Sequence, residues 1–180
     1  IGKALWLEKV KILVIADLHI GYEEYLNELG IAIPRQQFKL MHEELKNLLN
    51  LLKPKLIVIN GDLKHEFGEI SKQEWNETLA ILDLCLKHAK VVLVKGNHDT
   101  ILEPIARKKN VKIVDYYVVD SIVITHGHKI LNEFFDKQIK TIVIAHEHPA
   151  ISLREGIKVE KYKCWLIGRW HNKKLIVMPS

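Results

Sequence analysis

The stretch KILVIADLH, from Lys11 to His19, sets a pattern that the rest of the chain repeats. Its apolar part is short and mostly β-branched, which is typical of a strand covered on both faces in a parallel sheet. Two polar side chains, Asp17 and His19, follow at once. The runs LIVIN at 56–60 and VVLV at 91–94 have the same character. Because helical spacing of apolar residues separates the runs, the order β-α-β-α-β predicts right-handed crossovers and a parallel sheet.

The helices between these strands carry start signals. Apolar residues recur at helical spacing from Phe38 to Leu52, and two capping boxes, Ser71–Glu74 and Thr100–Glu103, predict the starts of two further helices. After Val111 the chain becomes rich in strands, with apolar runs at 116–119, 122–125, 141–145, 162–167 and 175–178 and one short helical candidate at 131–137. An α/β first half and a strand-rich second half predict two packed sheets with helices outside.

Composition excludes several classes of protein. The 180 residues are 48% hydrophobic and 27% charged, which excludes intrinsic disorder. No apolar stretch approaches the roughly 20 residues of a membrane span, and we find no signal-peptide pattern. Cys85 and Cys164 lie far apart in apolar surroundings, which predicts reduced, buried thiols and a cytoplasmic protein. We expect one domain over residues 1–180, with one or both ends trimmed from a longer chain.

Charge and histidine content leave one class of site open. The formal charge is +5, which permits phosphate-bearing partners, although scattered lysines on solvated faces explain it equally well. Ten histidines accompany only seven aspartates, which makes a metal or acid–base site worth seeking.

Polar side chains follow five of the predicted strands. Each group alone has a simpler explanation as a turn or as a pair of half-exposed histidines. Chance does not easily place all five at successive strand ends, where open α/β sheets bind their ligands. The groups are Asp17-Leu18-His19, Gly61-Asp62, Gly96-Asn97-His98-Asp99, His126-Gly127-His128 and His146-Glu147-His148.

The residue types favour transition metals. Mixed imidazole and carboxylate ligands suit Mn, Fe, Zn or Ni, and the lack of paired thiolates argues against a structural zinc site. Seven candidate ligands are too many for one ion and suit two ions that share a carboxylate. If these segments are extended, residues i and i+2 point the same way, so Asp17 and His19 form one ligand pair and His146 and His148 another. We expect the glycines at 61, 96 and 127 to make room beside a crowded site.

The ordered set D-x-H, G-D, G-N-H-D, H-G-H and H-x-H resembles the calcineurin-like metallophosphoesterase superfamily. The segments 16–21 (ADLHIG), 60–67 (NGDLKHEF) and 146–149 (HEHP) are similar to the branch of archaeal SbcD-related and bacterial ligase-associated phosphoesterases. The resemblance implies an α/β fold, a four-layer α/β/β/α sandwich of two mixed sheets flanked by helices. Ala145 departs from the glycine that usually precedes the final H-x-H.

The resemblance also implies roles for individual residues. Asp17, His19 and His148 would bind the first metal, Asn97, His126 and His146 the second, and Asp62 would bridge the two. A metal-bridging hydroxide would attack phosphorus in line with the leaving oxygen. His98 would stabilise the developing charge or protonate the leaving group, and Asp99 would orient its imidazole. His128, Lys64 and His65 are candidate substrate contacts, although Lys64 and His65 could equally be an exposed loop pair.

We therefore expect a dinuclear phosphoesterase that hydrolyses phosphodiesters, with nucleic acid or nucleotides among the candidate substrates. Its cofactors would be two divalent transition-metal ions, Mn first, with Ni, Fe and Zn as alternatives. A phosphomonoesterase is one alternative function, and a catalytically inactive scaffold is another. No membrane partner is expected, and the oligomeric state stays open.

Overall fold

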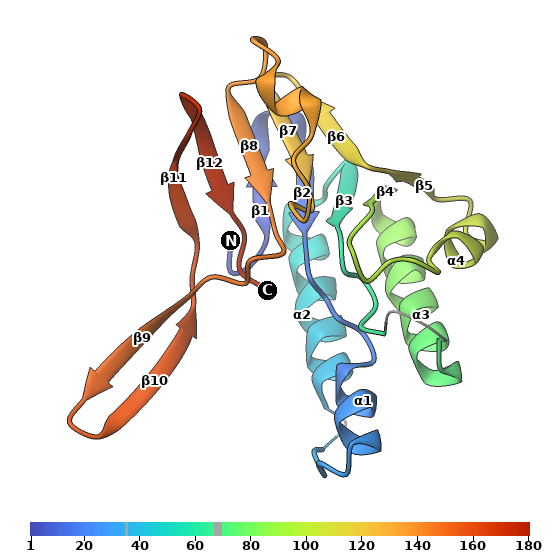
Figure 1. Cartoon of the computed structure of the whole chain (residues 1–180). Coiled ribbons are helices and arrows are strands. Elements are labelled where there is room, and N and C mark those ends of the chain that lie inside the picture. Colours follow the sequence, from blue (N-terminus) through green and yellow to red (C-terminus); the bar gives the residue numbers. More distant parts are fainter. Residues whose placement is uncertain (35, 67–69) are drawn as a thin grey trace.

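The computed structural model describes residues 1–34, 36–66 and 70–180, so Phe67 of the NGDLKHEF segment lies outside the described residues. The first of its two large sheets has the strand order β1-β2-β3-β4-β5 (Figure 1). β1 is antiparallel to β2, and the other neighbouring pairs are parallel. The strands are β1 (Leu5–Leu7), β2 (Ile12–Ile15), β3 (Leu56–Asn60), β4 (Lys90–Val94) and β5 (Lys112–Val114).

The second large sheet has the order β11-β12-β8-β7-β6 and is also mixed. Its three central strands are parallel, and both edge strands pair antiparallel. The strands are β6 (Tyr116–Val119), β7 (Ile122–Thr125), β8 (Thr141–Ile144), β11 (Leu166–Trp170) and β12 (Lys173–Val177). The single strand expected at 162–167 is wrong, because the chain leaves one sheet and joins another within it.

A hairpin of β9 (Ala150–Glu155) and β10 (Lys158–Lys163) accounts for that break. The hairpin forms its own two-stranded sheet and projects beyond the two large sheets (Figure 1). Every residue of β9 is exposed, and β10 is exposed except at Glu160. A two-stranded ribbon without a covered face is marginally stable by itself, so its connections to the large sheet must hold it in place.

Two long helices cover the outer face of the first sheet. These helices, α2 (Gln37–Leu52) and α3 (Lys72–His88), bury Leu49, Leu82 and Cys85 against the sheet. The Ser71 cap is confirmed, since its hydroxyl accepts a hydrogen bond from the Glu74 amide at 3.0 Å. The Thr100 box is wrong, because α4 (Glu103–Lys108) begins after Leu102. The short α1 (Tyr22–Glu28) follows β2, and none of the described helices is long and apolar enough to cross a membrane.

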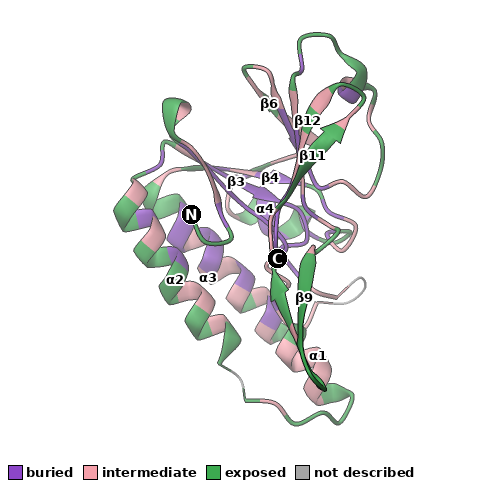
Figure 2. Ribbon diagram, turned by 90° about the vertical axis from the view of Figure 1, so that its left-hand side faces the viewer, coloured by how far each residue is buried: buried purple, intermediate pink, exposed green. Residues whose placement is uncertain are grey.

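Separate apolar clusters hold the layers together. Figure 2 shows buried residues in the strands and along the helices α2 and α3. Val14 and Val58 of the first sheet pack between the sheets with Ile124 and Val143 of the second. A 3₁₀ helix at Asn132–Phe135 packs on the outer face of the second sheet, where its Phe134 is buried. The predicted α/β fold of two mixed sheets flanked by helices is thus confirmed. Of the two predicted buried thiols, Cys85 is buried and Cys164 is partly exposed.

Candidate metal centre

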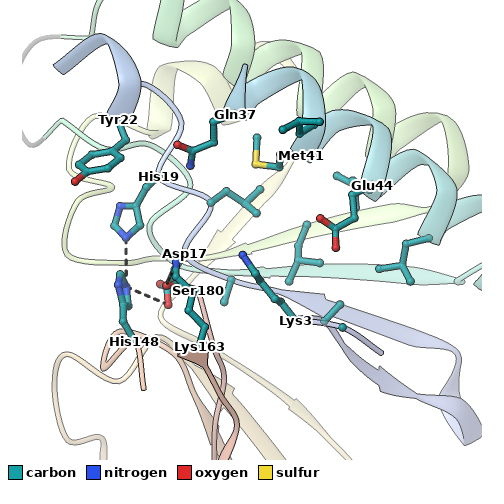
Figure 3. A pocket seen from close by; sticks show the side chains of 18 of the residues that line it. Lys3, Asp17, His19, Tyr22, Gln37, Met41, Glu44, His148, Lys163 and Ser180 are labelled. Carbon is teal, nitrogen blue, oxygen red and sulfur yellow. Dashed lines mark hydrogen bonds and ion pairs between the residues drawn. The ribbon is translucent and has the colours of Figure 1, made fainter. Parts of the chain in front are cut away.

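The carboxyl ends of β2 and β8 bring three of the predicted ligands together. Nε2 of His148 lies 3.3 Å from Nε2 of His19 and 3.4 Å from Oδ2 of Asp17. The three residues form one group of potential ligand atoms within 4.8 Å of one another (Figure 3). One buried carboxylate and two imidazoles are a donor set that divalent transition metals accept.

A second group lies beside the first and contains Asp62, His126 and His146. Nε2 of His126 is 3.2 Å from Oδ2 of Asp62 and 3.2 Å from Nδ1 of His146. The same nitrogen is 2.8 Å from Oδ1 of Asn97, which brings the amide of the GNHD segment to this group. The carboxyl ends of β3, β4, β7 and β8 therefore converge on one point.

The two groups touch each other and fit metal ions. Nδ1 of His126 lies 3.6 Å from Oδ1 of Asp17, which is too long for a good hydrogen bond although both side chains are fully buried. Ligand atoms about 2.1 Å from one ion stand about 3.0–3.4 Å apart in octahedral or tetrahedral geometry. The spacings of 3.2–3.4 Å within each group match that figure. The chemistry and spacing of these nitrogens and oxygens therefore fit ligands that share a cation.

The backbone at these residues differs from the extended path expected from the sequence. Asp17, His19, Asp62, His146 and His148 all have φ between 44° and 65°, the left-handed region that residues other than glycine rarely adopt. Strain of this kind persists where surrounding structure enforces it and is concentrated at functional sites. Because the turn separates their side chains, His146 and His148 join different groups, and the expectation that they form one ligand pair is wrong.

Two glycines leave space that the ligand side chains fill. A Cβ at Gly61 would stand 2.1 Å from Nδ1 of His126, and one at Gly96 would stand 2.2 Å from Oδ1 of Asp62. Neither distance is possible, so both positions require glycine. Ala145 replaces the usual glycine without conflict, because its methyl group is fully buried in the cluster between the sheets.

His98 lies at the edge of the second group. Its amide donates to Oδ1 of Asp62 at 3.0 Å, and its Nε2 is 3.8 Å from Oδ2 of the same carboxylate. Nδ1 contacts the carbonyl oxygen of His65, which holds the ring orientation. The carboxylate of Asp99 accepts instead from the amides of Gly96 and Leu63, at 2.9 and 3.1 Å. Asp99 thus ties two loops together, and its expected role in orienting the imidazole stays a prediction.

Burial and charge move the pKa values of the carboxylates in opposite directions. Burial raises the pKa of Asp17 to about 7, although the charge of His126 works against this rise. Burial would also raise the pKa of Asp62, but the hydrogen bond and charge of His126 outweigh it and lower the pKa to about 2. For His126, burial acts to lower the pKa, yet Asp62 prevails and raises it.

Four further histidines of the site have lowered pKa values, which favours the neutral form that binds metals. Burial lowers the pKa of His19 to about 4. It also lowers the pKa values of His65, His128 and His148, with neighbouring positive charges adding to the effect. A neutral imidazole offers a lone pair to a cation, so these rings suit ligation or hydrogen bonding at neutral pH.

A cavity of about 990 Å³ opens beside the first group and extends along α2 (Figure 3). His65 lines it, with ring centroids 5.5 Å from His19 and 5.6 Å from His98, so the structure places this candidate beside the site. His128 lies beside the second group, 5.3 Å from His126 between ring centroids. Lys64 is fully buried, and this burial contradicts the expected contact with a substrate phosphate.

Sequence patterns do not indicate several residues of the site. Tyr22 lies 4.8 Å from His65 between ring centroids and lines the cavity. Glu74 completes the sequence signature of a capping box, but its carboxylate accepts from the amides of His65 and Glu66, at 2.8 and 3.1 Å. It therefore supports the loop that holds His98, which the capping pattern could not reveal.

Comparisons with known proteins agree with this geometry. The family model of calcineurin-like phosphoesterases matches residues 10–172. Among solved structures, the chain is similar to the nuclease MPE of Pseudomonas putida, with a TM-score of 0.70 and 22% identity over 98% of this chain and 78% of the nuclease. At this identity the likeness shows a shared fold.

Two weaker structural likenesses carry no functional argument. A single mutant of Vps29 from Entamoeba histolytica has a TM-score of 0.41 and 16% identity, covering 92% of this chain and 72% of its own. Vacuolar protein sorting 29 from Cryptosporidium parvum has a TM-score of 0.40 and 16% identity, covering 93% and 95%. A search of curated protein sequences finds no match.

The family implies divalent metal ions, and the two ligand groups at the strand ends are where this chain can hold them. Since the matched region contains both groups and His98, the chain belongs to the calcineurin-like phosphoesterase family and is a metal-dependent phosphoester hydrolase.

Proposed function

We propose that the chain is a phosphodiesterase that uses two divalent transition-metal ions, with Mn²⁺ the first candidate. The observation that carries this proposal is the pair of adjoining ligand groups, the first of which lines a large cavity. Two such groups in contact suit a pair of ions. Two ions can hold one phosphoryl group from both sides, whereas a single ion cannot.

Each group would hold one ion. Asp17, His19 and His148 hold the first, and Asn97, His126 and His146 hold the second. Asp62 is proposed to bridge the two ions, because its carboxylate lies against His126 and its charge acts on Asp17 and His19 of the first group. Bound ions supply Lewis acidity and lower the pKa of water near phosphorus. His65, which lines the cavity, and His128, beside the second group, are proposed to contact the substrate.

His98 is placed to assist the leaving group. The carbonyl of His65 fixes Nδ1, so the ring cannot turn and Nε2 stays on the side of Asp62. Because Nδ1 donates to that carbonyl, Nε2 donates a hydrogen bond or a proton only from the doubly protonated ring, to an oxygen that gains charge as the ester bond breaks. Asp99 and Gly96 fix the loop that carries it.

The shape of the cavity favours diesters. It continues from His19 and His148 along α2, where Met41 and Leu48 give an apolar wall. A monoester has a single organic group, whereas a diester needs room for a second one on the far side of phosphorus. The fold shared with a nuclease and the likeness of segments 16–21, 60–67 and 146–149 to the SbcD-related and ligase-associated phosphoesterases favour nucleic acid as the diester.

Parallel assays test this proposal. Bis(p-nitrophenyl) phosphate and p-nitrophenyl phosphate are hydrolysed in the presence of Mn²⁺, Ni²⁺, Zn²⁺ or Mg²⁺. We expect faster turnover of the diester with Mn²⁺ and two bound ions per chain by elemental analysis. Asp62→Asn should abolish turnover, whereas Asp115→Asn, at an exposed position outside the centre, should not. Preference for the monoester would instead make the protein a phosphatase, and absence of both metal and turnover would make it a scaffold.

A further inference from the structure

Two lysines from distant parts of the chain extend into the cavity beside the first ligand group. Lys3 precedes β1 and Lys163 ends β10, and both line the cavity next to Asp17 and His148 (Figure 3). The indole nitrogen of Trp165 donates to the carbonyl of Gly2 at 3.0 Å. This bond ties the segment that carries Lys3 to the one that carries Lys163, so both side chains extend from linked parts of the backbone.

The two ammonium groups are close enough to affect each other. Partial burial lowers the pKa of Lys163, the charge of Lys3 lowers it further, and Asp17 acts in the opposite direction. Nζ of Lys163 donates to the hydroxyl of Ser180 at 3.0 Å. Glu44 of α2 lines the same cavity, but within the described part of the chain it forms no ion pair with either lysine. Asp17, whose charge acts on Lys163, belongs to the first ligand group, so two neighbouring cations remain at the cavity and favour a further anion there.

The face of the hairpin that carries Lys163 continues this positive charge. In the register of β9 and β10, Lys163 pairs with Ala150, Lys161 with Ser152, and Val159 with Arg154. Because paired residues and alternate residues share a face, Lys163, Lys161 and Arg154 lie on one side. The opposite side carries apolar residues together with Lys158, Glu155 and Glu160. Lys161 and Arg154 are exposed and, among the described residues, have no acidic partner.

We propose that Lys3 and Lys163 form a subsite for a second phosphate next to the scissile one, and that a polynucleotide strand continues from it along the basic face of the β9–β10 hairpin. The inference rests on the proposed phosphodiesterase function and adds the residues that select a polyanionic substrate. A polynucleotide carries phosphates at regular intervals, and the basic face of the hairpin carries cations at successive positions to bind them. A small diester with one phosphate would reach the metal centre without using the subsite.

Two matched substrates isolate the subsite. The p-nitrophenyl ester of thymidine 5′-phosphate has one phosphate, and the same ester with a 3′-phosphate has two. Both release p-nitrophenolate, so the ratio of their kcat/KM values measures the contribution of the second phosphate alone. We expect Lys3→Met and Lys163→Met each to lower this ratio about tenfold, the size of one charge-assisted hydrogen bond. Lys163→Arg should restore the ratio, and Lys158→Met, on the opposite face of the same strand, should leave it within twofold of the wild type.

A single-stranded oligothymidylate tests the hairpin. For its cleavage, log kcat/KM should fall with log salt concentration, and Lys161→Met and Arg154→Met should each reduce the slope by about 0.7. Lys158→Met should not change the slope. An equal loss in Lys158→Met, or an unchanged ratio in Lys3→Met and Lys163→Met, would overturn the inference. Hydrolysis of bis(p-nitrophenyl) phosphate without cleavage of the oligonucleotide would overturn it and leave the phosphodiesterase intact, whereas hydrolysis of neither would overturn both.

Discussion

Replacing Asp17 by Asn should stabilise the metal-free protein and weaken the metal-loaded one. In the folded chain, burial raises the pKa of Asp17 from 3.8 to about 7. A raised carboxyl pKa means that the folded state prefers the protonated form, so the wild type loses stability as the pH rises from about 4 through 7. Each tenfold change in proton affinity corresponds to about 1.4 kcal/mol, so the loss reaches about 4 kcal/mol above pH 7. Asparagine has no charge to bury and can still accept the hydrogen bond from the His146 amide.

Thermal unfolding in EDTA between pH 4.5 and 8 measures this difference. For a chain of this length, 1 kcal/mol shifts Tm by about 2–4 °C, so Asp17→Asn should unfold about 8–16 °C above the wild type at pH 8. The two proteins should converge near pH 4.5. His19 has the opposite dependence, because its pKa is lowered to about 4 and the folded protein loses stability as the pH falls below 6.5. That contribution is present in both proteins and cancels in the difference.

Addition of Mn²⁺ should reverse the order of stability. Metal binds the folded state and raises the Tm of the wild type, whereas Asp17→Asn lacks a ligand of the first group and should gain less. The same substitution at the exposed Asp115, which lies outside the centre, serves as the control. A lower Tm for Asp17→Asn than for the wild type in EDTA at pH 8 would refute the assigned cost of burying this carboxylate. An equal Mn²⁺-induced shift in both proteins would refute its role as a ligand.

Three further substitutions test the centre. Asp62→Asn should lower kcat/KM for the diester by at least about 10³-fold and halve the bound metal, since this carboxylate is the proposed bridge between the ions. Near-normal turnover would contradict the bridging role. His98→Ala should lower kcat by about 10²–10⁴-fold with metal content unchanged, and loss of metal would make it a ligand instead. Gly96→Ala should cost about 1–3 kcal/mol of unfolding free energy, because its Cβ would meet Oδ1 of Asp62 at 2.2 Å. Gly168→Ala, with open space around it, should cost far less, and equal losses would contradict the steric cause.

Local patterns predicted most of the first sheet and its helices. The β-branched runs at β2, β3 and β4 and the helical spacing of α2 reflect which residues must be buried. The order of apolar and polar residues along the chain shows this directly. The Ser71 cap is also local, because hydroxyl and amide are three residues apart. The Thr100 box failed because a capping pattern gives a helix start only where packing allows one, and Leu102, 1% exposed, is packed into the core there.

The sequence likewise indicates some features of the site, and only the fold shows the others. Aspartate, asparagine and histidine at strand ends are visible in the sequence because parallel strands end at one edge. Which histidine belongs to which group is not visible, since the left-handed turns at His146 and His148 direct neighbouring side chains apart. Neither the burial of Lys64 nor the contact of the His65 carbonyl with His98 has a sequence signal, because both depend on loops that meet only in the folded chain.

The sequence by itself therefore determined the sheets, the five polar strand ends and the family, all of which follow from short-range order and residue type. The tertiary structure decided how the ligands group, what holds His98, and that Lys3 and Lys163 stand side by side. The physical reason is distance along the chain. Lys3 and Lys163 are separated by most of the sequence, and only the fold, which brings the segment before β1 and the end of β10 to one cavity, places both charges there.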